Sequence, residues 1–110
     1  MARSWQLRRP ESTATVRTIA DGIAVRVPVP EALGDLEGVV DDIVLVSDDA
    51  LKRALRLVYQ HLRLVAEPSA VAGIAALMSH PSLAKGLVST VITGGNATEE
   101  QLQGWIKEVE

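Results

Sequence analysis

The sequence runs from an apolar stretch into two adjacent glycines, and this junction constrains the fold more than any other feature. Residues 91–96 read VITGGN, and Thr98 with Gln101 then forms a Thr-x-x-Gln capping box that predicts a helix start. Glycines at such a turn let backbone N–H groups approach a ligand, and a helix N-terminus favours negative charge. The junction predicts either one side of a small-ligand site or an ordinary tight turn between a strand and a helix.

The length and composition fit one domain with an aliphatic core. The chain has 110 residues, and 47% of them are hydrophobic, which argues against disorder. Only three residues are aromatic and the net charge is −3, so neither base stacking nor phosphate contacts with nucleic acid are expected. Cysteine is absent, which excludes disulfides and thiolate metal sites. No segment predicts a membrane span or a signal peptide, so we expect a soluble, cytoplasmic protein.

The N-terminal part differs in composition from the rest. Residues 1–17 are polar, carry four arginines and predict a loose N-terminal arm, whereas residues 18–110 predict a single α/β domain. The arginines indicate either a solvated tail or a contact with an anionic partner. Residues 22–28 are β-branched and bounded by breakers, which favours an extended segment or an edge strand. Pro30 is suited to the first position of a short helix.

Apolar runs of strand length alternate with helical patterns. Residues 43–46 and 87–92 are predicted strands, and the first is continuously apolar, which is typical of a strand covered on both faces. Between them, Ser47 caps a helix, and residues 70–79 are apolar all round and predict a buried helix. The order strand, helix, helix, strand, helix predicts an α/β fold with a small parallel-strand unit and a right-handed helical crossover.

The predicted helices carry two apolar faces. The first, after Ser47, comprises Leu51, Ala54, Leu55, Val58 and Leu62. The second, after Thr98, comprises Leu102, Trp105, Ile106 and Val109. Such spacing at three and four residues predicts helices that each bury one side against a core.

Glu67 is an acidic side chain between an apolar run and a predicted buried helix. A carboxylate there is costly unless it is paired or lies at a helix N-terminus. Glu67 is therefore a site residue or a helix-terminal charge. The remaining polar residues favour structural roles: His61 and His80 are isolated, and the aspartates flanking residues 43–46 stand on two different turns. No catalytic triad, phosphate-binding loop or metal-ligand spacing is present.

Four segments, in this order, resemble the threonine/serine dehydratases. They are residues 18–25 (TIADGIAV), 40–46 (VDDIVLV), 64–69 (LVAEPS) and 91–96 (VITGGN). This group of pyridoxal-phosphate enzymes has the type II fold and includes serine racemase. The resemblance covers nearly the whole chain, and it implies that the chain looks like the carboxyl-terminal third of the catalytic region of such an enzyme.

The resemblance also implies site residues. The residue at the position of Thr93 hydrogen-bonds the pyridine nitrogen of the cofactor in the family, where serine is usual and threonine keeps the hydroxyl. Gly94 and Gly95 would line the ring edge, with Asn96 completing the turn, and the acid at the position of Glu67 lies close to the ring. Ala70 stands where the family often has glycine, which is a mild departure.

A larger departure is the absence of groups that the family needs for catalysis. These are a lysine that forms the Schiff base, in a Ser-Phe-Lys-like segment, and a tetraglycine loop for the phosphate. The chain has only Lys52, Lys85 and Lys107, none in that context, and no such loop. Without the covalent link the cofactor provides no electron sink for α-proton loss. We therefore expect no catalytic residue and no bound cofactor in the lone chain.

Three functions are compatible with these residues and with the resemblance. The first is a truncated dehydratase-like protein, inactive alone or dependent on a partner that supplies the missing catalytic lobe. The second is an independent oligomeric binding or structural module that kept the fold without the chemistry. Apolar surface exposed by the missing lobe would favour a homo-oligomer, most simply a dimer. The third is a new activity at the 93–96 turn with Glu67 as base, although no nucleophile–base pair follows from the spacing.

Overall fold

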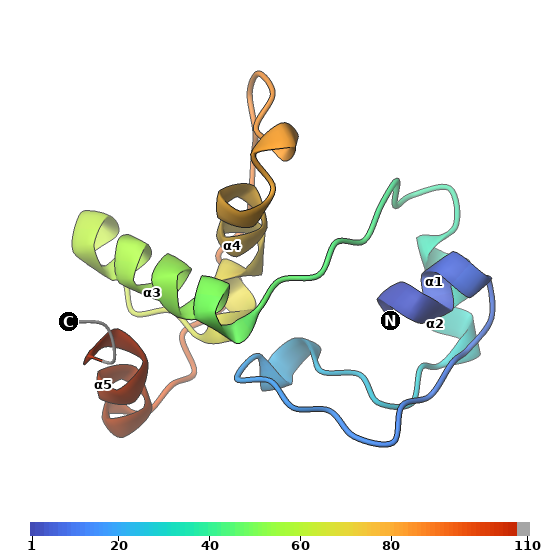
Figure 1. The fold of residues 1–110 in the computed structure, drawn as a ribbon, viewed down its shortest axis with the longest axis horizontal. Helices are drawn as coiled ribbons and strands as arrows, with labels where there is room; N and C mark the ends of the chain where they lie inside the picture. The colour runs from blue at the N-terminus through green and yellow to red at the C-terminus, as the bar shows by residue number, and fades with distance from the viewer. Residues whose placement is uncertain (108–110) are drawn as a thin grey trace. The chain divides into compact units, whose positions relative to one another are not determined.

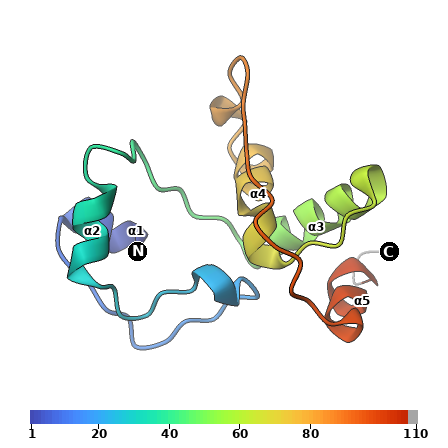
Figure 2. The same ribbon diagram turned by 180° about the vertical axis from the view of Figure 1, so that it is seen from behind.

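The chain divides into two units, which Figures 1 and 2 show from opposite sides. The computed structural model describes residues 1–107. The first unit comprises residues 1–18 and 23–45, and the second comprises residues 19–22 and the chain from residue 46 onward. No helix within residues 1–107 combines the length and hydrophobicity needed to cross a membrane.

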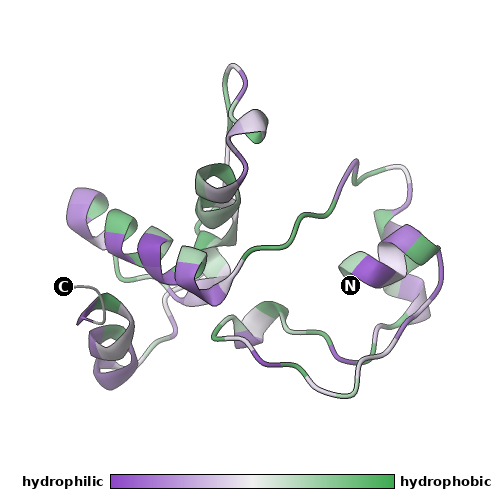
Figure 3. Cartoon of the chain, viewed as in Figure 1, coloured by the Kyte–Doolittle hydropathy of each residue, from purple (hydrophilic) through white to green (hydrophobic). Residues whose placement is uncertain are grey.

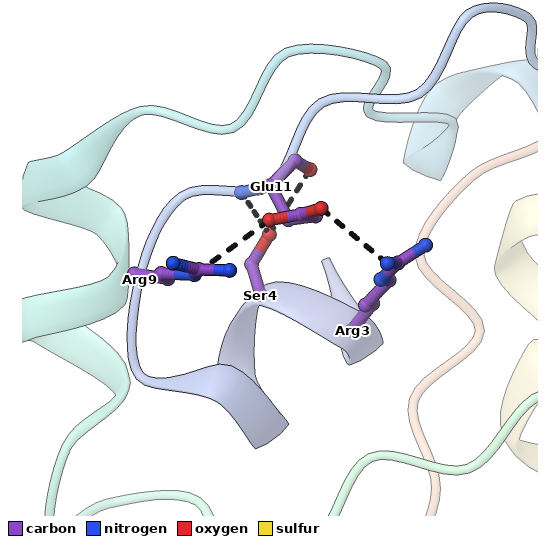
Figure 4. Close-up of polar contacts among 4 residues, drawn as sticks. All are labelled: Arg3, Ser4, Arg9 and Glu11. Carbon is purple, nitrogen blue, oxygen red and sulfur yellow. Dashed lines mark hydrogen bonds and ion pairs between the residues drawn. The ribbon is translucent and has the colours of Figure 1, made fainter.

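The first unit begins with a helix where the sequence predicted a loose arm. Helix α1 spans Ala2–Leu7, and its Ser4 is buried. The Ser4 hydroxyl donates to the Glu11 carbonyl oxygen at 3.2 Å and accepts from the Glu11 N–H at 2.9 Å. Arg3 and Arg9 lie 3.4 and 3.8 Å from the Glu11 carboxylate (Figure 4). These contacts fold the chain after α1 back onto it, which periodicity alone did not indicate.

A second helix in this unit ends next to Glu37, which forms an ion pair with Arg8. Helix α2 spans Pro30–Leu36 and begins at the proline, as predicted. Arg8 ends α1 in the left-handed region, with φ of 55°, and its guanidinium lies 3.0 Å from the carboxylate of Glu37. This pair is exposed and adds little stability. Because three of the four arginines in residues 1–17 have acidic partners, the sequence-based hypothesis of an anionic partner loses its main support.

The core of the second unit is built on helix α3, Asp48–Leu62. The Ser47 hydroxyl accepts from the Ala50 N–H at 3.2 Å, which confirms the predicted cap. Leu51, Ala54, Leu55 and Val58 are buried, as predicted, whereas Leu62 in the last position is exposed. In Figure 3 the helix carries both hydrophilic and hydrophobic residues, consistent with one buried face.

Three elements pack against α3: η2 (Pro68–Val71), α4 (Ala72–Ser79) and α5 (Glu99–Lys107). The predicted boundary of α4 at His80 is confirmed. The prediction that residues 70–79 are buried all round is wrong for this chain. Ala70, Val71 and Ala75 are buried, but Met78 is exposed, because the neighbours within the described residues leave part of the helix uncovered.

Helix α5 begins with the predicted capping box. The Thr98 N–H donates to Gln101 Oε1 at 2.9 Å, and the Gln101 N–H donates to Thr98 Oγ1 at 3.2 Å. Leu102, Trp105 and Ile106 are half-buried, and Trp105 packs on the core. Val109, the last residue predicted for this face, lies outside the described residues.

The predicted strands are not paired in a ladder anywhere in residues 1–107. Residues 43–46 were predicted to be covered on both faces, yet Leu45 is 76% exposed. In the 87–92 segment Leu87 is 98% and Val91 74% exposed. Residues 22–28 form no edge strand either and begin within the short turn η1 (Asp21–Ile23). A strand needs a neighbour along its length to pair its N–H and C=O groups in a ladder, and no such ladder forms within the described chain.

The 87–92 segment nevertheless packs on the rest of the second unit through Ile92, which lies against the core, and through Thr90. It runs beside α4 in both views (Figures 1 and 2), and a Cβ added at Gly73 would collide with the Thr90 hydroxyl. Gly73 therefore has a packing function inside a helix. By contrast, Gly104 in α5 has nothing within 4 Å of the position of a Cβ.

These two helical glycines should respond oppositely to the same substitution. We expect Gly104→Ala to raise the free energy of unfolding by up to about 1 kcal/mol, because alanine favours the helix and meets no obstacle. Gly73→Ala should lower it by about 1 kcal/mol, because Thr90 must move. Urea denaturation followed by circular dichroism measures both changes. Equal stabilisation by the two substitutions would contradict the close approach of Thr90.

Candidate functional site

The glycine turn at residues 93–96 lies against the backbone of the segment that follows α3. The Glu67 N–H donates to the Gly94 carbonyl oxygen at 3.1 Å. A Cβ on Gly95 would lie 2.6 Å from the Val65 carbonyl oxygen, closer than a real Cβ atom approaches a backbone atom. Gly95 is thus required by this contact, and the turn is positioned by residues that come well before it in the chain.

The Glu67 carboxylate lies over the same turn. Its Oε2 accepts from the Asn96 N–H at 3.1 Å. Its Oε1 lies 3.1 Å from the position of a Cβ on Gly94 and 3.8 Å from that of a Cβ on Gly22. Gly94 therefore leaves room for this carboxylate, whereas a Cβ on Gly22 would make only ordinary contact with it. The motifs at residues 18–25 and 91–96, which are distant in the sequence, thus meet at the Glu67 side chain of the motif at residues 64–69.

Ser69 and Gly22 belong to this cluster, although sequence reasoning did not single them out. The Ser69 Oγ is buried and has no hydrogen-bond partner within the described residues. A Cβ on Gly22 would lie 2.9 Å from that oxygen. The sequence could have indicated them, because Gly22 lies in the motif at residues 18–25 and Ser69 in the motif at residues 64–69. A buried hydroxyl without a partner beside a carboxylate is an observation in favour of a ligand group.

The predicted site residues differ in exposure. Thr93, Gly95 and Asn96 are exposed, whereas Gly94 and Glu67 are half-buried. The surface thus offers hydroxyls, backbone amides and one carboxylate. It offers groups that hold and orient a polar ligand rather than a nucleophile with its base.

Two hollows lie elsewhere in the chain, and neither is lined by Glu67, Ser69 or residues 93–96. One, of about 190 Å³, lies between α1 and α2 and is lined by Trp5, Arg8, Leu33 and Glu37 among others. The other, of about 280 Å³, lies between α3 and α5 and includes Tyr59, Val65, Leu102 and Ile106. No group of three metal-ligating acids or histidines occurs in residues 1–107. The predicted turn therefore remains the candidate site on the basis of its converging polar groups.

Comparison with known protein families shows which family the chain belongs to. The model of the pyridoxal-phosphate-dependent enzymes matches residues 1–94. The chain belongs to this family. The match includes three of the four motifs in full and reaches Gly94 in the fourth.

Individual family members show the same relationship over a limited length. Human serine racemase is 31% identical over 99 residues, which cover 84% of this chain and 28% of the racemase. The L-threonine ammonia-lyase of Thermotoga maritima is 30% identical over 96 residues, which cover 87% of this chain and 24% of the lyase. The chain therefore spans about a quarter to three tenths of these curated family members.

The fold agrees with that of a solved family member. The threonine deaminase from T.th. superposes with a TM-score of 0.82 at 28% identity, over 88% of this chain and 35% of the deaminase. The expected fold class, the carboxyl-terminal portion of a type II pyridoxal-phosphate enzyme, is confirmed. The chain reproduces that arrangement even though its own apolar runs form no ladder within the described residues.

Substitution of Gly95 tests the contact that positions the turn. We expect Gly95→Ala to lower the free energy of unfolding by about 2 kcal/mol, because the new Cβ must push the Val65 carbonyl away. The same movement should break the bond from the Glu67 N–H to Gly94, so the Glu67 amide should exchange faster with solvent deuterium. Gly34→Ala is the matched control, because nothing lies within 4 Å of that Cβ position. Unchanged exchange at Glu67 would contradict the geometry.

Proposed function

We propose that Glu67 and residues 93–96 form the ring-side wall of a pyridoxal-phosphate site of the threonine/serine dehydratase type. We further propose that the lone chain does not carry out the reaction. The observation that carries the proposal is the contact of Glu67 with Gly94 and Asn96, which joins two motifs that are distant in the sequence, in a chain of this enzyme family.

The residues present fit the ring side of that cofactor. Thr93 offers a hydroxyl for the pyridine nitrogen, and Gly94 and Gly95 carry no side chain at the ring edge. The Ser69 hydroxyl is buried without a partner among the described residues and is available for hydrogen bonding. When bound, pyridoxal phosphate withdraws electrons from the α-carbon of an amino-acid substrate. The chain's own residues would hold and orient the ring.

The chemistry also needs an amine and a phosphate-binding loop that these residues do not supply. Lys85 is exposed in the loop after the 3₁₀ turn η3 (Pro81–Leu83), and the Lys107 amine donates to Gln103 Oε1 on α5 at 3.4 Å. We propose that polypeptide outside these 110 residues provides both groups. Support comes from the share of the family members that the chain spans and from the exposed apolar runs at residues 43–46 and 87–92.

The role of Thr93 is tested with pyridoxine 5′-phosphate, which has the ring and phosphate but no aldehyde to react with lysines. We expect this ligand to shift the amide resonances of residues 93–96 in NMR titrations of the full chain. Thr93→Val should raise Kd by about threefold to tenfold, because one hydrogen bond to the ring is lost, whereas Thr93→Ser should leave Kd nearly unchanged. Thr15→Val, at an exposed threonine in the first unit, is the matched control.

Two results would contradict the proposed function. One is equal affinity of the Thr93→Val and Thr15→Val variants, which would remove Thr93 from the site. The other is release of 2-oxobutyrate from threonine by the purified chain with pyridoxal phosphate, which would show that these residues suffice for the reaction.

A second candidate function is an oligomeric binding or structural module in the cytoplasm. The exposure of Leu45, Leu87 and Val91 favours it, because self-association buries such apolar surface. The lack of cysteine fits a reducing compartment. This module would be a homo-oligomer, most simply a dimer, that does not need a catalytic lobe.

Light scattering and thermal unfolding separate the two candidates. An independent module should have the mass of a dimer and unfold in one sharp transition whose midpoint rises with protein concentration. A piece that needs a catalytic lobe should unfold broadly and bind dyes that detect exposed apolar surface. A monomer that unfolds sharply would contradict the oligomeric module.

A further inference from the structure

Glu67 has two possible roles at the turn: exchange of a proton with a ligand, or fixation of the chain that presents Thr93. We propose that Glu67 is a positioning residue whose carboxylate clamps the 93–96 turn in place. This inference rests on the proposed function only for its effect on ligand binding. The clamp itself is a property of the chain.

The contacts of residue 67 lie on both sides of Gly95. On one side, its backbone N–H donates to the Gly94 carbonyl oxygen at 3.1 Å. On the other side, its carboxylate Oε2 accepts from the Asn96 N–H at 3.1 Å. Between them, Gly95 lies against the Val65 carbonyl oxygen. The turn is thereby fixed at successive residues, and Thr93 immediately precedes the fixed part.

Both carboxylate oxygens are directed at this chain. Oε2 is engaged by Asn96, and Oε1 faces the α-carbons of Gly94 and Gly22, where a Cβ would lie 3.1 and 3.8 Å away. Gly94 thus leaves the space that the carboxylate occupies, and Gly22 borders that space at ordinary contact distance. A group that exchanges protons with a ligand needs an oxygen within hydrogen-bond reach of that ligand. The described contacts instead use the carboxylate to hold the turn.

The contact with the Asn96 N–H requires a side chain at residue 67 of suitable length that ends in a hydrogen-bond acceptor. Glutamate places a charged acceptor at the Asn96 N–H, and charge-assisted hydrogen bonds are about twice as strong as neutral ones. Glutamine has the same length and keeps one acceptor oxygen. Methionine has a similar length and offers only a weak sulfur acceptor. These substitutions separate positioning from proton transfer, because glutamine can accept a hydrogen bond but cannot act as an acid or base at neutral pH.

The test measures hydrogen exchange of the Asn96 amide in the full chain, without ligand. We expect Glu67→Met to accelerate this exchange by about tenfold or more, and Glu67→Gln by only about threefold. Glu100→Gln is the matched control at an exposed position of α5 and should leave the Asn96 amide unchanged. In the same variants, the affinity for pyridoxine 5′-phosphate should follow the exchange: nearly retained in Glu67→Gln and lost in Glu67→Met.

The alternative outcomes are distinct. If Glu67→Met leaves Asn96 exchange unchanged, the clamp is overturned. If Glu67→Gln loses ligand affinity as completely as Glu67→Met while Asn96 stays protected, the carboxylate acts on the ligand and the positioning role is overturned. If exchange follows the prediction but no variant binds pyridoxine 5′-phosphate, the clamp stands and the proposed function fails.

A second substitution keeps the inference testable if the methionine variant does not fold. Gly94→Ala would place a Cβ 3.1 Å from Oε1 and displace the carboxylate without removing it. We expect faster Asn96 exchange in this variant, with no further acceleration when Glu67→Gln is added, because both changes act on the same contact. Independent, additive effects would overturn the clamp.

Discussion

The candidate site depends on the close approach of the 93–96 turn to the backbone of residues 65–67. That approach is possible only because Gly95 has no side chain where the Val65 carbonyl oxygen lies. Once the backbones meet, the Glu67 N–H reaches Gly94 and its carboxylate reaches Asn96. The turn is thus held both by a main-chain hydrogen bond and by the carboxylate of Glu67.

Helix α3 supplies the support for that geometry. Its apolar face contributes to a core with Ala66, Ala70 and Val71, which flank Glu67 on both sides in the chain. Burial of the neighbours of Glu67 fixes the backbone at residue 67 and hence the point from which its carboxylate extends. A half-buried charge is tolerated there because it accepts a backbone hydrogen bond and remains partly exposed to water.

Membership of the pyridoxal-phosphate-dependent enzymes agrees with the motifs that the chain shares with that family, which it carries over only part of a family member's length. The chain spans 35% of the solved threonine deaminase, and residues 43–46 and 87–92 expose apolar side chains without strand partners within residues 1–107. Sheets stabilise strands through neighbours on both edges and layers on both faces. The two apolar runs, which the sequence predicts as strands, therefore lack the ladder that the prediction implies within the described chain.

The sequence by itself determined the features that arise within a few residues. The cap at Ser47, the capping box at Thr98, the start of α2 at Pro30 and most of the buried stripe of α3 were all predictable, because helix ends and faces follow local hydrogen bonding and periodicity. Resemblance to a family identified Thr93, the two glycines, Asn96 and Glu67 as one group, but not how they meet. Only the tertiary structure decided the rest: the helix tied to Glu11, the apolar runs that form no strand ladder within the described chain, and the place of Ser69 and Gly22 near Glu67. Each of these depends on the packing of whole elements, for which a local pattern of residue types carries no information.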